Sequence, residues 1–382
     1  MTTGERWIAG GRLAGGGEVA LRVQGGRIVA NQRQVPASSK VETIDLRGHW
    51  IAPFAIDSHV HLAFAASLGA SDADNPALVT ARLNLTADLM TAGGVCAAID
   101  LGAPRALMPA LEKLGTQANP VGPSAHSRGL PTRRCSLAQS GPLLCAPHGY
   151  PTQSWGQDGY GLAVSTPDEA RAAVTGLHKE GALFAKLALD ARFPVLAPVV
   201  AKAVVAEAKK LGMRSAAHAL DVVAVKRALE AGVEILAHTP VEPLPEALIA
   251  ECGARKLIVL STLHAFGGTK AARENVARLA HAGCHAIYGT DLGNQETLPG
   301  ILGPELHQLS ESGFSGAQIL AMCTQDAAAL LGDATLGSLT VGSRAHILVL
   351  EEDPTRDPTA LTRPAARYFD GAPLVTNCLG SP

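Results

Sequence analysis

Two histidines separated by one residue are the first side chains of this sequence that could do metal chemistry. His59 and His61 follow an apolar run over residues 50–56. In a β-strand the side chains at i and i+2 point to the same face, so the two imidazoles can lie side by side as ligands of one metal ion. A histidine pair at a strand end is, taken alone, more often structural than functional. The rest of the chain has to decide between the two interpretations.

Four further residues of suitable type lie in or directly after apolar, strand-like segments. Lys186 is the one charged residue in the run 184–189, and His218, His238 and Asp291 each end or follow another run. If these segments are parallel strands of one barrel, their carboxyl ends meet at the same mouth, where barrel active sites lie. We therefore expect six residues to gather there, which a chance occurrence of one His-x-His does not explain.

The elements that would position these residues alternate between strand and helix. We expect strands at 51–58, 95–100, 119–124, 183–189, 213–217, 233–238, 257–262 and 285–290. We expect helices at 76–92, 104–114, 167–181, 195–211, 221–231, 243–254, 269–282 and 299–313, with one more at 315–331. Eight strand–helix units over about 260 residues predict an α/β fold of the (β/α)8 TIM barrel type. A doubly wound open sheet is the alternative, but no Gly-x-Gly-x-x-Gly motif follows an early strand.

Both ends of the chain show a different pattern, of short strands and tight turns. Gly-Gly pairs punctuate residues 5–50, and Asp370-Gly371 marks a hairpin within 337–379. Neither segment is long enough to bury its own apolar face, so we expect the two to pack together. The predicted domains are a small β-sandwich from 1–50 plus 337–382, and a catalytic barrel over 51–336.

Composition excludes several classes of protein. The 382 residues carry a formal net charge of −2, without a basic run, which gives no reason to expect nucleic acid or a membrane surface as a partner. No apolar run is as long as a membrane span, and the amino terminus does not resemble a signal peptide. The seven cysteines form no Cys-x-x-Cys pair. We therefore expect a cytoplasmic protein with reduced thiols that acts on a small molecule.

The six residues and their spacing resemble the two-metal branch of the amidohydrolase superfamily. His59-Val60-His61 matches the motif of strand 1, Lys186 matches the lysine of strand 4, and the ligands of strands 5, 6 and 8 match His218, His238 and Asp291. Within this branch, the motifs ending at these residues look most like imidazolonepropionase-related and Xaa-Pro dipeptidase-like members. Two departures concern subgroup placement: Pro53-Phe54 stands where the family commonly has Pro-Gly, and Ala345-His346 where it commonly has Ala-Asp.

The resemblance implies a mechanism and its cofactors. Two divalent metal ions, zinc being the family's usual choice, would be held by His59, His61, Lys186, His218, His238 and Asp291. A carbamate formed from carbon dioxide on Lys186 would bridge them; it requires a neutral amine, which an apolar strand favours. Metal-activated hydroxide would attack an amide-type carbonyl, with Asp291 as general base and then acid. The substrate would be a cyclic amide, a small peptide or an N-acyl amide, and the protein a homodimer.

Other polar residues are candidates for contact with the substrate. His126 and Arg128 follow the expected strand 3, His148 and Tyr150 lie in the long segment 125–166, and His264 follows the expected strand 7. Each could polarise a carbonyl or pair with a carboxylate. His126 and His264 come directly after barrel strands, so we expect them to act in catalysis beside Asp291.

Two other functions stay open at this point. A one-metal deaminase of the same superfamily would lack the bridging lysine and would carry a glutamate shortly after the histidine of strand 5. Here His218 is followed by Ala219-Leu220-Asp221, and Lys186 is present. A binding protein on this fold is the other alternative, because a fold does not fix a function; the retention of all six residues argues against it.

Overall fold

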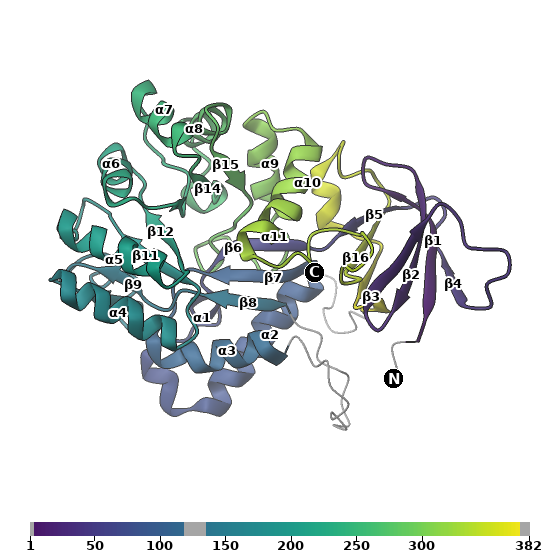
Figure 1. The fold of residues 1–382 in the computed structure, drawn as a ribbon, viewed down its shortest axis with the longest axis horizontal. Helices are drawn as coiled ribbons and strands as arrows, with labels where there is room; N and C mark the ends of the chain where they lie inside the picture. Colours follow the sequence, from purple (N-terminus) through teal and green to yellow (C-terminus); the bar gives the residue numbers. More distant parts are fainter. Residues whose placement is uncertain (1–3, 118–134, 375–382) are drawn as a thin grey trace.

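The computed structural model describes residues 4–117 and 135–374. One sheet gathers strands from both ends of the chain (Figure 1). Its strands are β1 (Arg6–Leu13), β2 (Glu18–Gln24), β3 (Arg27–Gln32), β4 (Glu42–Asp45), β5 (Trp50–Pro53), β16 (Ile347–Leu350), β17 (Ala366–Phe369) and β18 (Ala372–Pro373). The amino- and carboxyl-terminal parts meet where β5 pairs with β1 on one side and with β16 on the other.

Local sequence explains the hairpins of this sheet. Gly25 and Gly26 join β2 to β3 with φ values of 59° and 80°, the left-handed conformation that a two-residue hairpin turn requires and that glycine adopts without strain. Apolar side chains of Ile8, Leu21 and Ile347 come from three different strands and pack into one cluster. The association of the two terminal segments therefore buries an apolar face that neither could cover alone.

The remaining strands run parallel and form a closed barrel. They are β6 (Ala55–Val60), β7 (Val95–Asp100), β8 (Ser136–Gln139), β9 (Leu143–Cys145), β11 (Phe184–Ala188), β12 (Arg214–His218), β13 (Ile235–Leu236), β14 (Ile258–Leu260) and β15 (His285–Ile287), with β10 (Gly161–Ala163) added beside β9. The amide of Leu183 donates to Gln139 O at 2.9 Å, which joins β8 to the start of β11. The amide of Asp291 donates to His59 O at 2.8 Å, so the chain after β15 returns to β6 and closes the ring.

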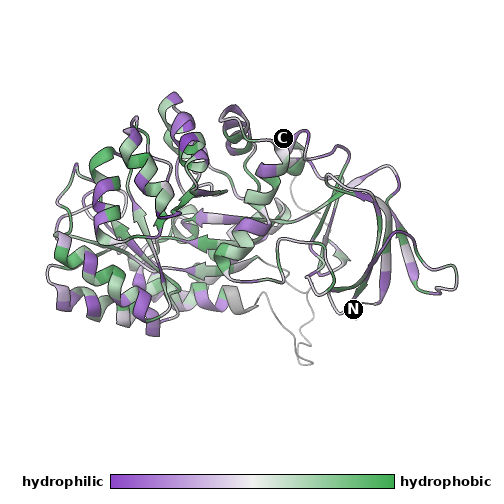
Figure 2. Ribbon diagram, turned by 45° about the horizontal axis from the view of Figure 1, so that its top comes forward, coloured by the Kyte–Doolittle hydropathy of each residue, from purple (hydrophilic) through white to green (hydrophobic). Residues whose placement is uncertain are grey.

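Helices follow the barrel strands along the chain and cover the outside (Figure 1). They are α2 (Pro76–Ala92), α3 (Met108–Gln117), α4 (Pro167–Lys179), α5 (Pro198–Lys210), α6 (Val222–Ala231), α7 (Glu246–Ala254), α8 (Lys270–His281), α9 (Gly303–Glu311), α10 (Gly316–Cys323) and α11 (Gln325–Leu331). Helix α5 is typical: Val200 and Val204 are buried, whereas Lys202 and Lys209 are exposed. Figure 2 shows hydrophilic and hydrophobic residues alternating along these helices in the same way.

These observations confirm the predicted TIM barrel with a β-sandwich built from both termini. They also correct the first predicted strand, which is two strands rather than one. Its first half is β5, which belongs to the terminal sheet, and its second half is β6 of the barrel. The break lies at Phe54, whose amide donates to His346 O at 3.2 Å. A continuous apolar run hid this break because both halves are buried.

The third barrel strand was also predicted at the wrong place. The strand that pairs with β7 is β8, at 136–139, whereas the expected 119–124 lies outside the described residues. Strands β8 and β9 are separated by Ser140-Gly141-Pro142, with φ of 68° at Gly141, so no unbroken apolar run marked them in the sequence. The helix expected over 315–331 is two helices, because the backbone breaks at Thr324.

The predicted domain boundaries at residues 50 and 336, between the β-sandwich and the barrel, stay a prediction. Within the described part of the chain, no helix is long and apolar enough to cross a membrane.

Candidate metal centre

The six residues singled out from the sequence lie together at the carboxyl ends of the barrel strands. His59 is in β6, Lys186 in β11 and His218 ends β12, while His61, His238 and Asp291 follow β6, β13 and β15. None of these side chains belongs to a residue more than 5% exposed. So many polar groups are rarely buried together without a partner that neutralises them.

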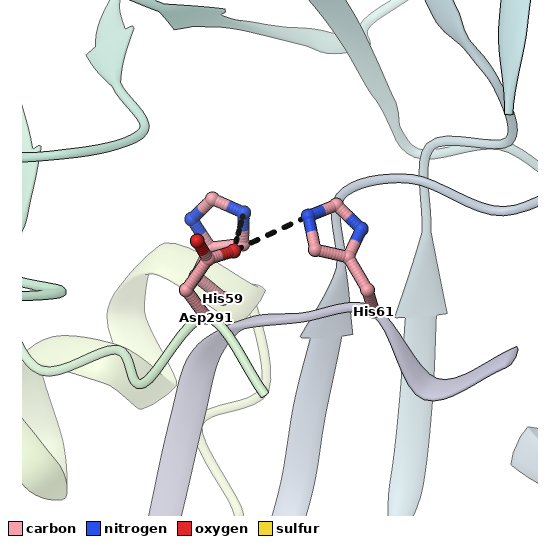
Figure 3. A group of neighbouring side chains, drawn as sticks. All are labelled: His59, His61 and Asp291. Carbon is pink, nitrogen blue, oxygen red and sulfur yellow. Dashed lines mark ion pairs between the residues drawn. The ribbon is translucent and has the colours of Figure 1, made fainter. Parts of the chain in front are cut away.

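His59 and His61 direct their Nε2 atoms at the carboxylate of Asp291. The Nδ1 atom of His59 lies 2.7 Å from Ala237 O, and Nδ1 of His61 lies 3.0 Å from Gly102 O. A carbonyl can only accept, so both Nδ1 atoms must carry the hydrogen, and in the neutral rings both Nε2 atoms then hold lone pairs. Each Nε2 lies 3.2 Å from Oδ1 of Asp291 (Figure 3).

With both rings neutral, three electron-pair donors converge without a hydrogen between them. Oδ1 of Asp291 is buried and has no hydrogen-bond partner among the described residues. The ligand atoms of His59, His61 and Asp291 all lie within 4.8 Å of one another. Such an arrangement is repulsive unless a cation lies between the atoms, and imidazole with carboxylate is a ligand set that divalent metals take. The residues present thus fit a metal ion.

A second carboxylate holds this group in place. Asp57 accepts hydrogen bonds from the amide of His59 at 3.2 Å and from the amide and hydroxyl of Thr290 at 3.0 and 2.6 Å. It thereby ties β6 to the residue before Asp291, as expected of an anchor that is not itself a ligand. Burial raises the pKa of Asp57 to about 7, although these hydrogen bonds oppose the shift. Asp291 itself has φ of 57°, and the side-chain amide Nδ2 of Asn294 donates a hydrogen bond to its Oδ2.

Lys186, His218 and His238 extend the cluster beyond His59. The ring of His238 lies 4.6 Å from that of His59 and 4.7 Å from that of His218, measured between centroids. Nζ of Lys186 lies 3.5 Å from Nε2 of His59. The Nε2 atom of His218 is buried and has no hydrogen bond to any described residue. One further free donor atom, Nε2 of His218, thus lies in the part of the cluster beside His59, whereas Nδ1 of His238 lies 3.1 Å from the Thr262 hydroxyl.

Burial sets the protonation states of this cluster. It lowers the pKa of Lys186 to about 7, the nearby carboxylates of Asp291 and Asp100 opposing the shift. It lowers the pKa of His218 to about 3, with the charge of Lys186 adding to the effect, and it holds the pKa of His59 and His238 well below the usual range. These three imidazoles are therefore neutral near pH 7 and available as ligands.

The residues predicted to contact the substrate do not all lie at this cluster. Tyr150 lies at the cluster, with its ring stacked on that of His218 at 4.4 Å. His264 opens the short η3 helix (His264–Phe266) after β14, and its amide donates to Glu305 Oε2 at 2.7 Å. His148 is exposed, with φ of 58°. His126 and Arg128 lie outside the described residues and precede β8, so the expectation that they follow strand 3 is wrong.

Sequence reasoning missed two polar residues near His218. Asp190 follows β11 and is 5% exposed; its Oδ2 lies 3.9 Å from Nε2 of His218. Arg192 donates to Asp190 through Nε and Nη2, at 3.0 and 2.6 Å, and keeps most of its side chain exposed. The rule that pointed to His218, a polar residue just past a barrel strand, would also have found Asp190.

Comparison with known proteins gives a family model and several solved structures. Residues 50–373 match the model of the amidohydrolase family. A Xaa-Pro dipeptidase with bound methionine in its active site has a TM-score of 0.78 and 19% identity, covering 97% of this chain and 99% of its own. A putative prolidase from Bifidobacterium longum has a TM-score of 0.76 and 24% identity, covering 98% and 95%. A molinate hydrolase has a TM-score of 0.76 and 18% identity, and the match covers 98% of this chain and 95% of the molinate hydrolase chain. No curated protein matches the sequence.

Proposed function

Since this chain belongs to the amidohydrolase family and is a metal-dependent hydrolase of C–N bonds, we propose that it uses two divalent ions, zinc in the first place, to cleave an amide-type bond. One observation carries the proposal. Nε2 of His59, Nε2 of His61 and Oδ1 of Asp291 converge, and the buried Nε2 of His218, which has no hydrogen-bond partner among the described residues, lies in the same cluster. A single metal ion would leave the buried Nε2 of His218 without a partner.

Two groups of side chains would share the metals between them. His59, His61 and Asp291 would hold the first ion, and His218 and His238 the second. We assign the bridge to a carbamate on Lys186, which forms when neutral Nζ attacks the carbon of carbon dioxide and loses one proton. The pKa of about 7 leaves a large fraction of this amine neutral at physiological pH. A one-metal deaminase would lack the bridging lysine, so the buried Lys186 beside His59 favours the two-metal function.

The side chains around the metals would orient the substrate and move the proton. Bound divalent ions lower the pKa of coordinated water and polarise a carbonyl. Asp291, at the same mouth, would take a proton from the attacking water and deliver it to the leaving nitrogen. The side-chain amide of Asn294 donates a hydrogen bond to Oδ2 of Asp291, which fixes the orientation of that carboxylate. Tyr150, His148 and His264 would contact the substrate, with His264 also acting in catalysis. The roles of His126 and Arg128, which lie outside the described residues, stay predictions.

The substrate would be a cyclic amide, a small peptide or an N-acyl amide. Solved structures of similar fold include a Xaa-Pro dipeptidase and a molinate hydrolase, which supports a small molecule with one scissile C–N bond. We place the enzyme in the cytoplasm, because the six described cysteines are buried and form no disulfide. A homodimer of two such chains is the proposed assembly.

Hydrolysis before and after metal removal tests this function. The purified protein is assayed against lactams, hydantoins, Xaa-Pro dipeptides and N-acyl amino acids, then treated with a chelator and reloaded with zinc, manganese or cobalt. We expect activity on one of these classes to disappear with the metal and to return on reloading. His218→Asn should bind fewer metal ions and lose that activity. The matched control is His307→Asn, a change at an exposed position of α9 outside the cluster, which should leave both unchanged. Activity that survives complete metal removal would refute the proposal.

A further inference from the structure

Aromatic side chains are scarce in this chain, and a group of them lies at the barrel mouth. The sequence has three tryptophans, four tyrosines and seven phenylalanines, only 4% of the residues. Five of these rings are half-buried and surround the histidine cluster, namely Phe64, Tyr150, Trp155, Phe193 and Phe266. Aromatic rings usually stabilise a fold by being fully buried. Rings left partly exposed beside buried ligands are typical of a binding site.

The rings contact the histidines from two different segments, the one after β9 and the η3 helix. Trp155 lies 5.1 Å from His61 between ring centroids, and Phe266 of the η3 helix lies 4.8 Å from His238. Tyr150 covers His218 at 4.4 Å. Three of the clustered histidines therefore each have an aromatic ring beside them.

Contacts among the rings hold two of these faces in fixed positions. Nε1 of Trp155 donates to the hydroxyl of Tyr150 at 2.7 Å. Phe64 packs against Trp155 at 4.9 Å, and Phe193 packs against Tyr150 at 5.9 Å. A wall fixed in this way loses little conformational entropy when a ligand binds, which favours a flat apolar partner over a flexible polar one.

We propose that the substrate carries an aromatic or similarly flat apolar group next to its scissile C–N bond, bound by Tyr150, Trp155 and Phe266. This inference rests on the proposed function and narrows it, since any of the substrate classes above can carry such a group. The rings then determine specificity, while the histidine cluster carries out the chemistry.

Calorimetric binding of small amides tests the proposal without requiring turnover. Benzamide and N-benzylacetamide are each compared with acetamide and N-methylacetamide, on zinc-loaded and on metal-free protein. We expect each ring compound to bind at least about tenfold more tightly than its ringless partner. Tyr150→Ala and Trp155→Ala should bring that ratio close to one, whereas Tyr150→Phe, which keeps the ring, should preserve it.

Phe314→Leu is the matched control, because Phe314 is also half-buried but lies with His285 and Ile258, the first residues of their strands, at the opposite end of the barrel. It should leave the ratio unchanged. Equal affinity for the ring and ringless amides, no measurable binding of either, or an equal loss in Phe314→Leu would overturn the inference. A preserved ring preference in a protein that hydrolyses nothing would instead refute the proposed function and leave this inference standing.

Discussion

Replacing Lys186 by methionine should stabilise the metal-free protein while abolishing its activity. Lys186 is 1% exposed, and burial lowers its pKa from 10.5 to about 7. Between these two values the unfolded chain holds a proton that the folded protein has lost, so wild-type stability rises with pH across this window. Below about pH 7 the folded protein carries the full cost of burying the charge, which this difference in pKa puts at roughly 5 kcal/mol. Methionine keeps the apolar stem and removes that cost.

Urea unfolding of metal-free wild type and Lys186→Met at pH 6 and at pH 9 measures the effect. The variant should be more stable at pH 6 by up to roughly 5 kcal/mol, and this advantage should shrink by about 3 kcal/mol at pH 9. Lys202→Met, an exposed lysine on α5, is the control and should show no such dependence on pH. A Lys186→Met variant that is less stable than the wild type at pH 6, or equally favoured at both pH values, would contradict a buried lysine of lowered pKa.

Three further variants probe the cluster and its supports. His59→Ala should lose metal and activity but keep the far-ultraviolet circular dichroism of the folded barrel; full activity with an unchanged metal content would make the histidine structural. Asp57→Asn should weaken metal affinity about 10- to 100-fold, because the Thr290 hydroxyl loses its acceptor. The metal affinity of His59→Ala and Asp57→Asn is measured by metal titration. Burial raises the pKa of Glu305 from 4.5 to about 7, so the folded protein keeps a proton that the unfolded chain loses, and stability should fall as the pH rises through this range. Glu305→Gln should flatten that fall in urea unfolding from pH 5 to 8, and an unchanged slope would contradict the assignment.

The sequence predicts those parts of the fold where local pattern and burial agree. Strand β7 has the predicted bounds, 95–100, because a short buried run lies between two helices. The ligand positions follow from one rule, that the carboxyl ends of parallel strands meet, and this rule needs no knowledge of side-chain geometry. The rule therefore predicts His218 and Asp291 as site residues from the sequence alone.

The features that were missed depend on contacts between distant segments. Nothing local shows that residues 50–53 pair with β16, which lies nearly 300 residues further along the chain. The placement of Tyr150 on His218 and of Trp155 on His61 depends on how the segment after β9 folds over the mouth. The tautomers of His59 and His61 follow from two backbone carbonyls, Ala237 O and Gly102 O, whose positions no sequence pattern records.

Metal analysis of purified protein, with carbon-13 NMR after addition of labelled bicarbonate, tests the proposed two-metal centre most directly. We expect close to two divalent ions per chain and a carbamate carbon signal that is absent from Lys186→Met. That variant should also bind less metal than the wild type. A fully active protein that contains no metal, or one that holds a single ion and gives no carbamate signal, would contradict the proposed two-metal centre.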